Sequence, residues 1–327
     1  YNSMLQLAQD VQERAAHQLV LAELYYSLRD YDEVVATCRS ILALDIPDVR
    51  TEQPYFAKEK AYFLLGDTHN LRNEQDVLIA TYREALGRYP RSYYSGDMTF
   101  ALGEALFGRE DLAGAVQVFT TYRDDFPDHP NQSYGLYYLG YALFNLTEFE
   151  RAAEVFAELA AAYADSELAP DALFRAGEAR YNLGQFMTAR ESYERVLEAH
   201  GGTDTADDAM YNLAWTLLNL EQEEEALSTF HQLTESYASS PLAANARFTI
   251  GDYLYNAQRY EEALAAYEEV VERYPDCDVA KKVPEILGDL REVVAYLQYA
   301  EVESVFVEAL AEEDPVSYTH LTLPTKA

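Results

Sequence analysis

The sequence has few cysteines and histidines, two residue types that are common in catalytic and metal sites. It has two cysteines, Cys38 and Cys277, and six histidines, none of which lie at the spacing of metal ligands. No Ser or Cys stands in a nucleophile motif, and no glycine-rich phosphate-binding loop precedes an expected helix. We therefore expect no catalytic residues, no metal and no cofactor.

Basic residues and long apolar runs are also scarce. The chain has 24 Lys and Arg against 57 Asp and Glu, a net charge of −33. This charge repels nucleic acid and anionic membrane surfaces, which excludes both as expected partners. No apolar run reaches the roughly 18–20 residues that cross a bilayer, so we expect no membrane insertion. The acidity also suits solubility or salty water, in which case acidic residues should cover both faces of the fold evenly.

Glycine is uncommon too, yet six of the 14 glycines recur in phase every 37 residues. The positions of this glycine column are Gly66, Gly103, Gly140, Gly177, Ala214, Gly251 and Gly288, with the alanine filling one gap. Self-similarity at this period indicates stacked helical repeats. A glycine inside a helix costs about 1 kcal/mol relative to alanine, so a recurring one needs a packing reason.

Two further columns keep the same phase. Small residues stand twelve positions after the glycine column, at Ala115, Ala152, Ala189, Ala226 and Ala263. Aromatic residues follow four positions later, at Tyr82, Phe119, Phe156, Tyr193, Phe230 and Tyr267. We expect each glycine to face the alanine of an antiparallel partner helix, so that the two axes approach closely and the aromatic ring wedges between neighbouring pairs.

Together these columns resemble the tetratricopeptide repeat, whose usual period is 34 residues, over roughly residues 12–310. The resemblance implies an all-α fold, a right-handed α-solenoid of antiparallel helix pairs. Residues 15–310 would hold about seven to eight units, with a loop insertion near residues 45–53. Residues 1–14 would be the remnant of a preceding repeat helix.

The last residues share neither the acidity nor the periodicity of the repeats. Residues 311–327 are expected to be a non-native or disordered tail. Within it, residues 316–327 resemble the translation of a sequencing adapter. We therefore leave this tail out of the fold assignment.

Each unit carries three extra residues after its second helix, which often ends in an aromatic residue and proline, as in Tyr89-Pro90 and Tyr274-Pro275. This longer linker resembles bacterial cell-envelope repeat proteins of the Tol-Pal coordinator and outer-membrane assembly lipoprotein types. That resemblance implies a non-catalytic interaction scaffold in the periplasm or cell envelope. The alternatives are a cytoplasmic location and an interaction module of a larger, truncated multidomain enzyme or regulator.

In such repeats the first helix lines the concave face, which implies a candidate groove. Three positions before the glycine column stand Phe63, Phe100, Tyr137, Phe174, Tyr211 and Phe248. One position after it stand Asp67, Glu104, Tyr141, Glu178, Trp215 and Asp252. Four positions after it stand Asn70, Phe107, Phe144, Tyr181, Leu218 and Tyr255.

Aromatic rings interleaved with carboxylates suit a basic or aromatic-rich protein or peptide, through ring burial, cation–π contact and charge pairing. The alternative for the rings is packing on the neighbouring repeat. A further ladder, Asn145, Asn182, Asn219 and Asn256, offers either a clamp for a peptide backbone or residues suited to the turn at the helix end.

Overall fold

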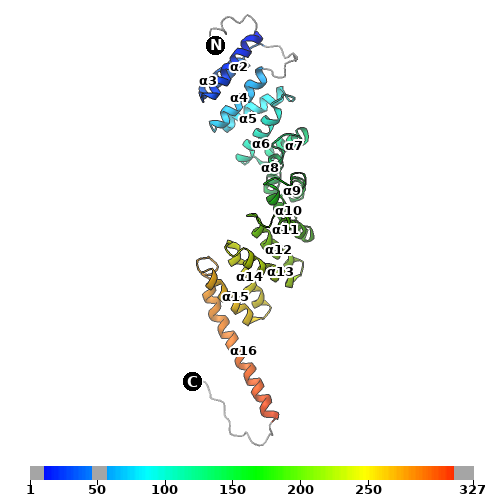
Figure 1. Ribbon diagram of the computed structural model, residues 1–327, viewed down its shortest axis with the longest axis vertical. Helices are drawn as coiled ribbons and strands as arrows, with labels where there is room; N and C mark the ends of the chain where they lie inside the picture. The colour runs from blue at the N-terminus through cyan, green and yellow to red at the C-terminus, as the bar shows by residue number, and fades with distance from the viewer. Residues whose placement is uncertain (1–10, 46–56, 313–327) are drawn as a thin grey trace. The chain divides into compact units, whose positions relative to one another are not determined.

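The computed structural model describes residues 11–45 and 57–312, and in these ranges the chain forms only α-helices and their connections. The predicted all-α fold is therefore confirmed. The chain divides into two compact units, residues 1–192 and 193–327. Figure 1 labels the helices along the chain.

In the first unit the helices alternate between a first and a second helix of each repeat. The first helices are α2 (Val11–Ser27), α4 (Ala57–Leu71), α6 (Ser95–Gly108), α8 (Gln132–Asn145) and α10 (Ala169–Asn182). The second helices are α3 (Tyr31–Leu42), α5 (Gln75–Arg88), α7 (Leu112–Asp125) and α9 (Phe149–Ala162). Each of these helices packs against the next along the chain, and first helices also meet, as α2 with α4 and α6 with α8.

The second unit repeats this pattern. It contains α12 (Ala206–Asn219), α13 (Glu223–Ser236), α14 (Pro241–Asn256), α15 (Tyr260–Arg273) and α16 (Val283–Glu312), and each packs on the next. The two first helices α12 and α14 are also in contact. Helix α11 (Phe186–His200) includes the boundary between the units.

The glycine column is explained by an aromatic ring rather than by an alanine. A Cβ built on Gly140 would lie 2.6 Å from Cε1 of Phe156, and one on Gly251 would lie 2.7 Å from Cε1 of Tyr267. The same clash with the ring sixteen residues later occurs at Gly66 and Gly103. The prediction that glycine faces alanine is therefore wrong: the ring of the second helix packs directly against the glycine of the first.

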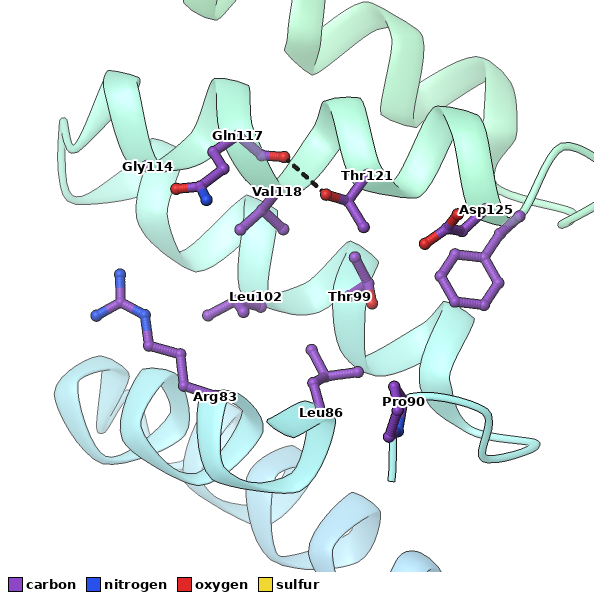
Figure 2. Close-up of a pocket in the computed structure, with 11 residues that line it drawn as sticks. Arg83, Leu86, Pro90, Thr99, Leu102, Gly114, Gln117, Val118, Thr121 and Asp125 are labelled. Carbon is purple, nitrogen blue, oxygen red and sulfur yellow. Dashed lines mark hydrogen bonds between the residues drawn. The ribbon is translucent and has the colours of Figure 1, made fainter. Parts of the chain in front are cut away.

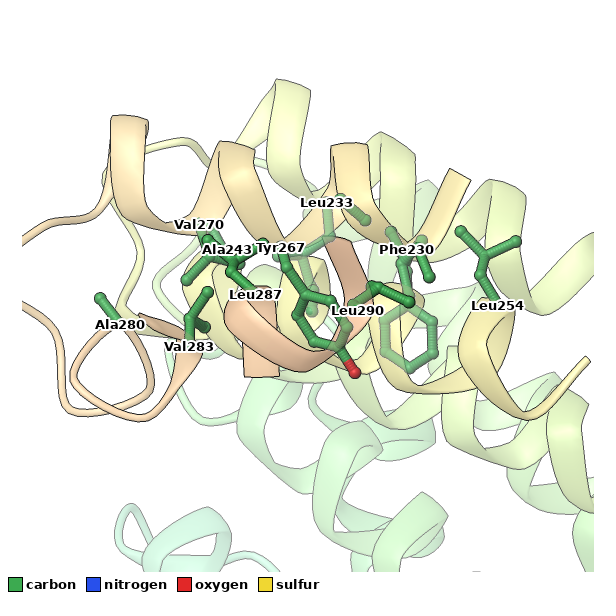
Figure 3. Packing of buried hydrophobic residues seen from close by; sticks show 14 of the residues in the cluster. Phe230, Leu233, Ala243, Leu254, Tyr267, Val270, Ala280, Val283, Leu287 and Leu290 are labelled. Carbon is green, nitrogen blue, oxygen red and sulfur yellow. The ribbon is translucent and has the colours of Figure 1, made fainter. Parts of the chain in front are cut away.

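These rings form the centre of each repeat. Phe156 is fully buried, and Tyr267 is 2% exposed. The alanine column is buried as well, at Ala115, Ala152, Ala189, Ala226 and Ala263. In the second unit Phe230 and Tyr267 join Leu254 and Leu290 in one apolar cluster, to which α13, α14, α15 and α16 all contribute (Figure 3).

Gly288 departs from its column. A Cβ on it would meet nothing within 4 Å, because α16 continues through this position as a single helix of 30 residues. Sixteen residues later the sequence has Ser304 instead of an aromatic ring. No aromatic ring packs against Gly288, and the prediction that it marks a contact between two helices is wrong.

A left-handed residue stands two positions after the end of each first helix, and from Asn73 onward this is seven positions after the glycine column. These residues are Arg29, Asn73, Glu110, Thr147, Gly184, Glu221 and Gln258. At Thr147 φ is +60°, and the next amide, of Glu148, donates to the Leu143 carbonyl at 2.9 Å. The left-handed residue of each turn is therefore not an asparagine of the ladder. Asn145, Asn182, Asn219 and Asn256 are each the last residue of a helix, two positions earlier.

Five of the second helices, α5, α7, α9, α13 and α15, end at a shared backbone geometry, with or without proline. Their capping residues Tyr89, Phe126, Tyr163, Tyr237 and Tyr274 have φ between −130° and −125° and ψ between 46° and 58°. The predicted aromatic end is confirmed in these five helices, whereas α3 is capped by Ala43 with φ −77°. Proline follows only some of the five aromatic residues.

One expected segment boundary differs from the structure, and two expected segments lie mostly or wholly outside the described residues. The expected boundary at residue 14 lies inside α2, which begins at Val11. The loop insertion near residues 45–53 falls mostly outside the described residues, and the adapter-like residues 316–327 do so entirely. In the part of the chain that the structure describes, no helix is long and apolar enough to cross a membrane.

The ring contact predicts opposite effects for one substitution at two glycines. Gly140→Leu should cost about 1–3 kcal/mol because the side chain overpacks against Phe156. Gly288→Leu should stabilise by up to about 1 kcal/mol, since leucine is a better helix former and its Cβ meets no neighbour within 4 Å. Urea unfolding of both variants checks this, and a similar loss at both positions would contradict it.

The left-handed turns give a second matched pair. Thr147→Gly should stabilise by about 0.5–1 kcal/mol, because a β-branched residue is strained at positive φ. Gly184→Ala should destabilise by a similar amount, about 0.5–1 kcal/mol, at the equivalent turn, where φ is +73°. Thermal unfolding measures both, and the account fails if the two variants shift in the same direction.

Candidate binding groove

The predicted groove positions share one face of each first helix, but they differ in burial. Tyr137, Tyr211 and Phe248 are half-buried, as a binding surface requires. Phe100 and Phe174 are only 9% and 5% exposed. These two are therefore core residues and not groove residues as predicted.

Phe100 shows how this happens. Its ring contacts Phe119 and Tyr122 of α7 and Tyr138 of α8, with centroid distances of 5.5–6.3 Å. At the N-terminal end of the array, Phe63 is instead half-buried and stacks on Tyr94 at 4.8 Å. Packing on the neighbouring repeat therefore accounts for part of the aromatic ladder.

The positions four after the glycine column also have internal partners. Each packs edge-on against the first aromatic residue of its own second helix, in the pairs Phe144–Phe149 at 5.1 Å, Tyr181–Phe186 at 5.3 Å and Tyr255–Tyr260 at 5.5 Å. Phe107 instead contacts Tyr138 of α8 at 5.3 Å. These rings brace the turn or the next repeat.

Between α8 and α10 the groove face carries a polar network. The hydroxyls of Tyr137 and Tyr141 each donate to Oδ2 of Asp171 at 2.8 Å. Nε of Arg175 donates to the Tyr141 hydroxyl at 2.7 Å, and its Nη1 pairs with Oε2 of Glu178 at 2.6 Å. Glu178, which we predicted to face a basic partner, is therefore already neutralised by a residue of this chain.

The guanidinium of Arg175 also lies against two rings. Its Cζ is 5.3 Å from the centroid of Tyr141 and 5.2 Å from that of Phe174. Burial lowers the pKa of Arg175, but the charges of Glu178, Tyr141 and Asp171 outweigh it and the net pKa is raised. The side chain therefore stays charged within an aromatic and acidic surround.

The other carboxylates of the groove accept hydrogen bonds from tyrosines. Asp67 accepts from the hydroxyl of Tyr26, and Asp252 accepts from that of Tyr267. Glu104 accepts from Tyr138, and burial raises the pKa of Glu104 against that bond. A tyrosine fixes each carboxylate but, unlike Arg175, brings no positive charge.

Between α12 and α14 the predicted residues surround a pocket of about 450 Å³. Tyr211, Trp215 and Leu218 line it from α12, and Phe248 and Asp252 line it from α14. The remaining lining residues, all from α14, are Asn245, Thr249, Tyr253 and Asn256. The structure thus brings together five predicted groove residues around one cavity.

The residue two positions before the glycine column decides whether such a pocket is open. Between α8 and α10 this residue is Arg175, and between α6 and α8 it is Tyr138, which contacts Phe107 and Phe119. Between α12 and α14 it is Thr249, and between α4 and α6 it is Ala101, which lines a pocket of about 340 Å³. Large residues at this position fill the space, and small ones leave it open.

Sequence reasoning missed this position, and it missed Asp171 and Asn245, which stand six residues before the column. The helical period places both positions on the face of the predicted groove residues, so the sequence did contain the signal. The hydrogen bonds of the asparagine ladder are local at two sites: Nδ2 of Asn182 and Asn219 donates to the carbonyls of Glu178 and Trp215 at 2.9 Å. Asn256 lines the α12–α14 pocket.

A separate pocket of about 340 Å³ lies among α5, α6 and α7 and contains no predicted groove residue. Leu86, Leu102 and Val118 provide its apolar lining, and Figure 2 shows Arg83 and Asp125 at opposite ends. The sequence did not indicate it, because its residues come from three helices and share no column. In the described part of the chain, no group of three or more His, Cys, Asp or Glu could hold a metal ion.

Paired helices repeating every 37 residues, with an aromatic ring packed against Gly66, Gly103, Gly140 and Gly251, define a helical-repeat protein. The chain matches the tetratricopeptide repeat family over residues 79–130, 100–167, 137–202, 174–230 and 211–276. These segments cover more than half of the sequence, and the chain therefore belongs to the tetratricopeptide repeat family.

Solved structures are similar to this chain at low sequence identity. The C-terminal part of a TPR repeat-containing protein from Cytophaga hutchinsonii is 13% identical, with a TM-score of 0.57, over 81% of this chain and 98% of that one. MamA from Desulfovibrio magneticus is 18% identical, with a TM-score of 0.45, over 56% of this chain and 96% of that one. No curated protein matches the chain in sequence.

The raised pKa of Glu104 gives a pH prediction for the groove. The folded state binds a proton at a pH where the unfolded state has already lost it, so this group stabilises the fold as pH falls through its raised pKa. Glu104→Gln should stabilise the protein at neutral pH and remove this contribution. Urea unfolding between acidic and neutral pH measures it.

Glu154, exposed on α9, supplies the control. Glu154→Gln should leave both the stability at neutral pH and its pH dependence nearly unchanged. If Glu104→Gln behaved in the same way, burial of Glu104 would have no energetic consequence.

Proposed function

We propose that the chain is a non-catalytic interaction scaffold that binds a segment of a partner protein along the candidate groove. The observation that carries this proposal is the α12–α14 pocket, where five predicted groove residues surround about 450 Å³ of space. Tetratricopeptide repeats present their first helices to partners, and this pocket lies between two such helices.

The lining of the pocket has the composition of an interface hot spot. Tyr211 and Trp215 meet edge-on at 6.3 Å, and Trp215 also packs on the buried ring of Phe230 at 5.9 Å. Two of the rings that line the pocket are thus held in place before any partner arrives, which lowers the entropic cost of binding. Trp and Tyr are enriched among the residues that contribute most to binding energy.

Charge supports a basic partner segment. The chain has a net charge of −33, and Asp252 lies in the pocket lining. A strongly acidic protein attracts basic segments at long range and speeds their encounter, an effect that salt weakens. We therefore propose that the bound segment is basic and carries at least one large side chain.

We further propose that this scaffold works in a bacterial cell envelope. The support is the 37-residue period with its long linker and the endings Tyr89-Pro90 and Tyr274-Pro275. Cell fractionation of the source bacterium with an antibody against the protein tests this. Recovery in the periplasmic or envelope fraction supports the proposal, and recovery in the cytoplasmic fraction overturns it.

Trp215, the only tryptophan of the chain, gives a direct test of binding. Peptides selected from a random twelve-residue library should shift its fluorescence, because its indole lines the pocket. Trp215→Ala should weaken their binding about tenfold or more, measured by the anisotropy of a labelled peptide.

Tyr296, exposed on α16 and outside the pocket, is the control. Tyr296→Ala should bind the selected peptides as the parent protein does. Peptides that bind equally well to the Trp215→Ala variant would show that the groove is not where this protein binds.

A further inference from the structure

We propose that the α12–α14 pocket is a specificity site for an arginine side chain of the partner, whose guanidinium lies against Trp215 and Phe248 and pairs with Asp252. This inference rests on the proposed function and names the chemistry that the pocket selects. Another interface of the same protein already contains the arrangement that we propose.

The α8–α10 and α12–α14 interfaces correspond residue by residue, two repeats apart. Tyr137 and Tyr141 of α8 correspond to Tyr211 and Trp215 of α12. On the second helix of each pair, Asp171, Phe174, Arg175 and Glu178 correspond to Asn245, Phe248, Thr249 and Asp252. The aromatic pair and one of the two acids are kept, whereas Asp171, whose Oδ1 lies 3.4 Å from Nε of Arg175, is replaced by Asn245 and the arginine by a short side chain.

Arg175 shows what such a surround accepts. Its guanidinium lies 5.3 Å from the ring centroid of Tyr141 and 5.2 Å from that of Phe174, and it pairs with Glu178 at 2.6 Å. A planar cation can stack on rings and hydrogen-bond a carboxylate at once, which a neutral side chain cannot do. The chain thus supplies its own arginine ligand at this interface.

At the α12–α14 interface the cation is missing. Thr249 is too short to reach Trp215 in the way that Arg175 reaches Tyr141, and the space between the helices is the pocket of about 450 Å³. Tyr267 donates to Oδ1 of Asp252, which fixes this carboxylate. Among the described residues no lysine or arginine forms an ion pair with Asp252, so its charge lacks a cation.

The α6–α8 interface shows why arginine is favoured over tyrosine as the occupant. There the space is filled by Tyr138, which donates to the acid Glu104 on the first helix. Glu104 stands one position after the glycine column on α6. The equivalent residue is aromatic on the other two helices, Tyr141 on α8 and Trp215 on α12. An aromatic ring there and an acid on the next helix match the arginine arrangement, and tryptophan offers the strongest cation–π face.

The first experiment compares four blocked pentapeptides that differ only at their central residue. The central residue is arginine, citrulline, lysine or tyrosine between alanines, and Trp215 fluorescence reports binding. Citrulline has nearly the shape of arginine without its charge. The arginine peptide should bind about tenfold more tightly than the citrulline peptide, and the difference should shrink at high salt or with Asp252→Asn.

The second experiment introduces an arginine into the α12–α14 pocket at the position equivalent to Arg175. Thr249→Arg should place a guanidinium in the pocket as Arg175 does between α8 and α10. It should raise the ratio of folded to unfolded protein about fivefold, shield Trp215 from iodide quenching and block the arginine peptide. In the Asp252→Asn background the gain in stability should disappear, and Thr249→Leu controls for bulk without charge.

The outcomes separate the two proposals. Equal binding of the arginine, citrulline and tyrosine peptides, or a Thr249→Arg variant no more stable than Thr249→Leu, would overturn the arginine site. That result would leave the groove as a general peptide site if library peptides still depend on Trp215. A library that yields no Trp215-dependent binder, with none of the four pentapeptides bound, would overturn both proposals.

Discussion

The structure depends on one contact, an aromatic ring of the second helix packed against a glycine of the first at Gly66, Gly103, Gly140 and Gly251. A side chain as small as alanine at Gly140 would place its Cβ 2.6 Å from Phe156, so the ring in its present position leaves no room for a side chain there. Because Phe156 is fully buried, this contact sets how closely the two helices approach and how they are rotated. Repeated every 37 residues, it fixes which face of each first helix remains for other uses.

The groove face of the first helices can vary in sequence because the contact between ring and glycine holds the helix pairs together. The residue two positions before the glycine column changes from Tyr138 to Arg175 to Thr249 without disturbing the helix pairs. Where this residue is large, the protein fills its own groove, and where it is small, a pocket remains. One scaffold can therefore present open and closed subsites along its length, and side-chain size at a single column sets the difference.

The repeat, the buried ring column and the helix ends could be predicted from the sequence, because each repeats at a fixed spacing. Three features could not be predicted in the same way. Glycine was paired with alanine instead of the ring, since spacing along the chain does not show which side chain crosses between helices. The column pattern also assigns Phe100 to the groove, because it does not show that Tyr138 of the next repeat covers this ring. The pocket of Figure 2 draws on three helices and follows no column.

The most direct test of the central contact is a double-mutant cycle between Gly140 and Phe156, measured by urea unfolding. Gly140→Ala should destabilise the parent protein by roughly 1–3 kcal/mol because its Cβ overpacks against the ring. In the Phe156→Leu background the same substitution should cost little or become favourable, since the ring is gone and alanine is the better helix former. An equal cost in both backgrounds would mean that the glycine and the ring are independent, and the account of the fold would be wrong.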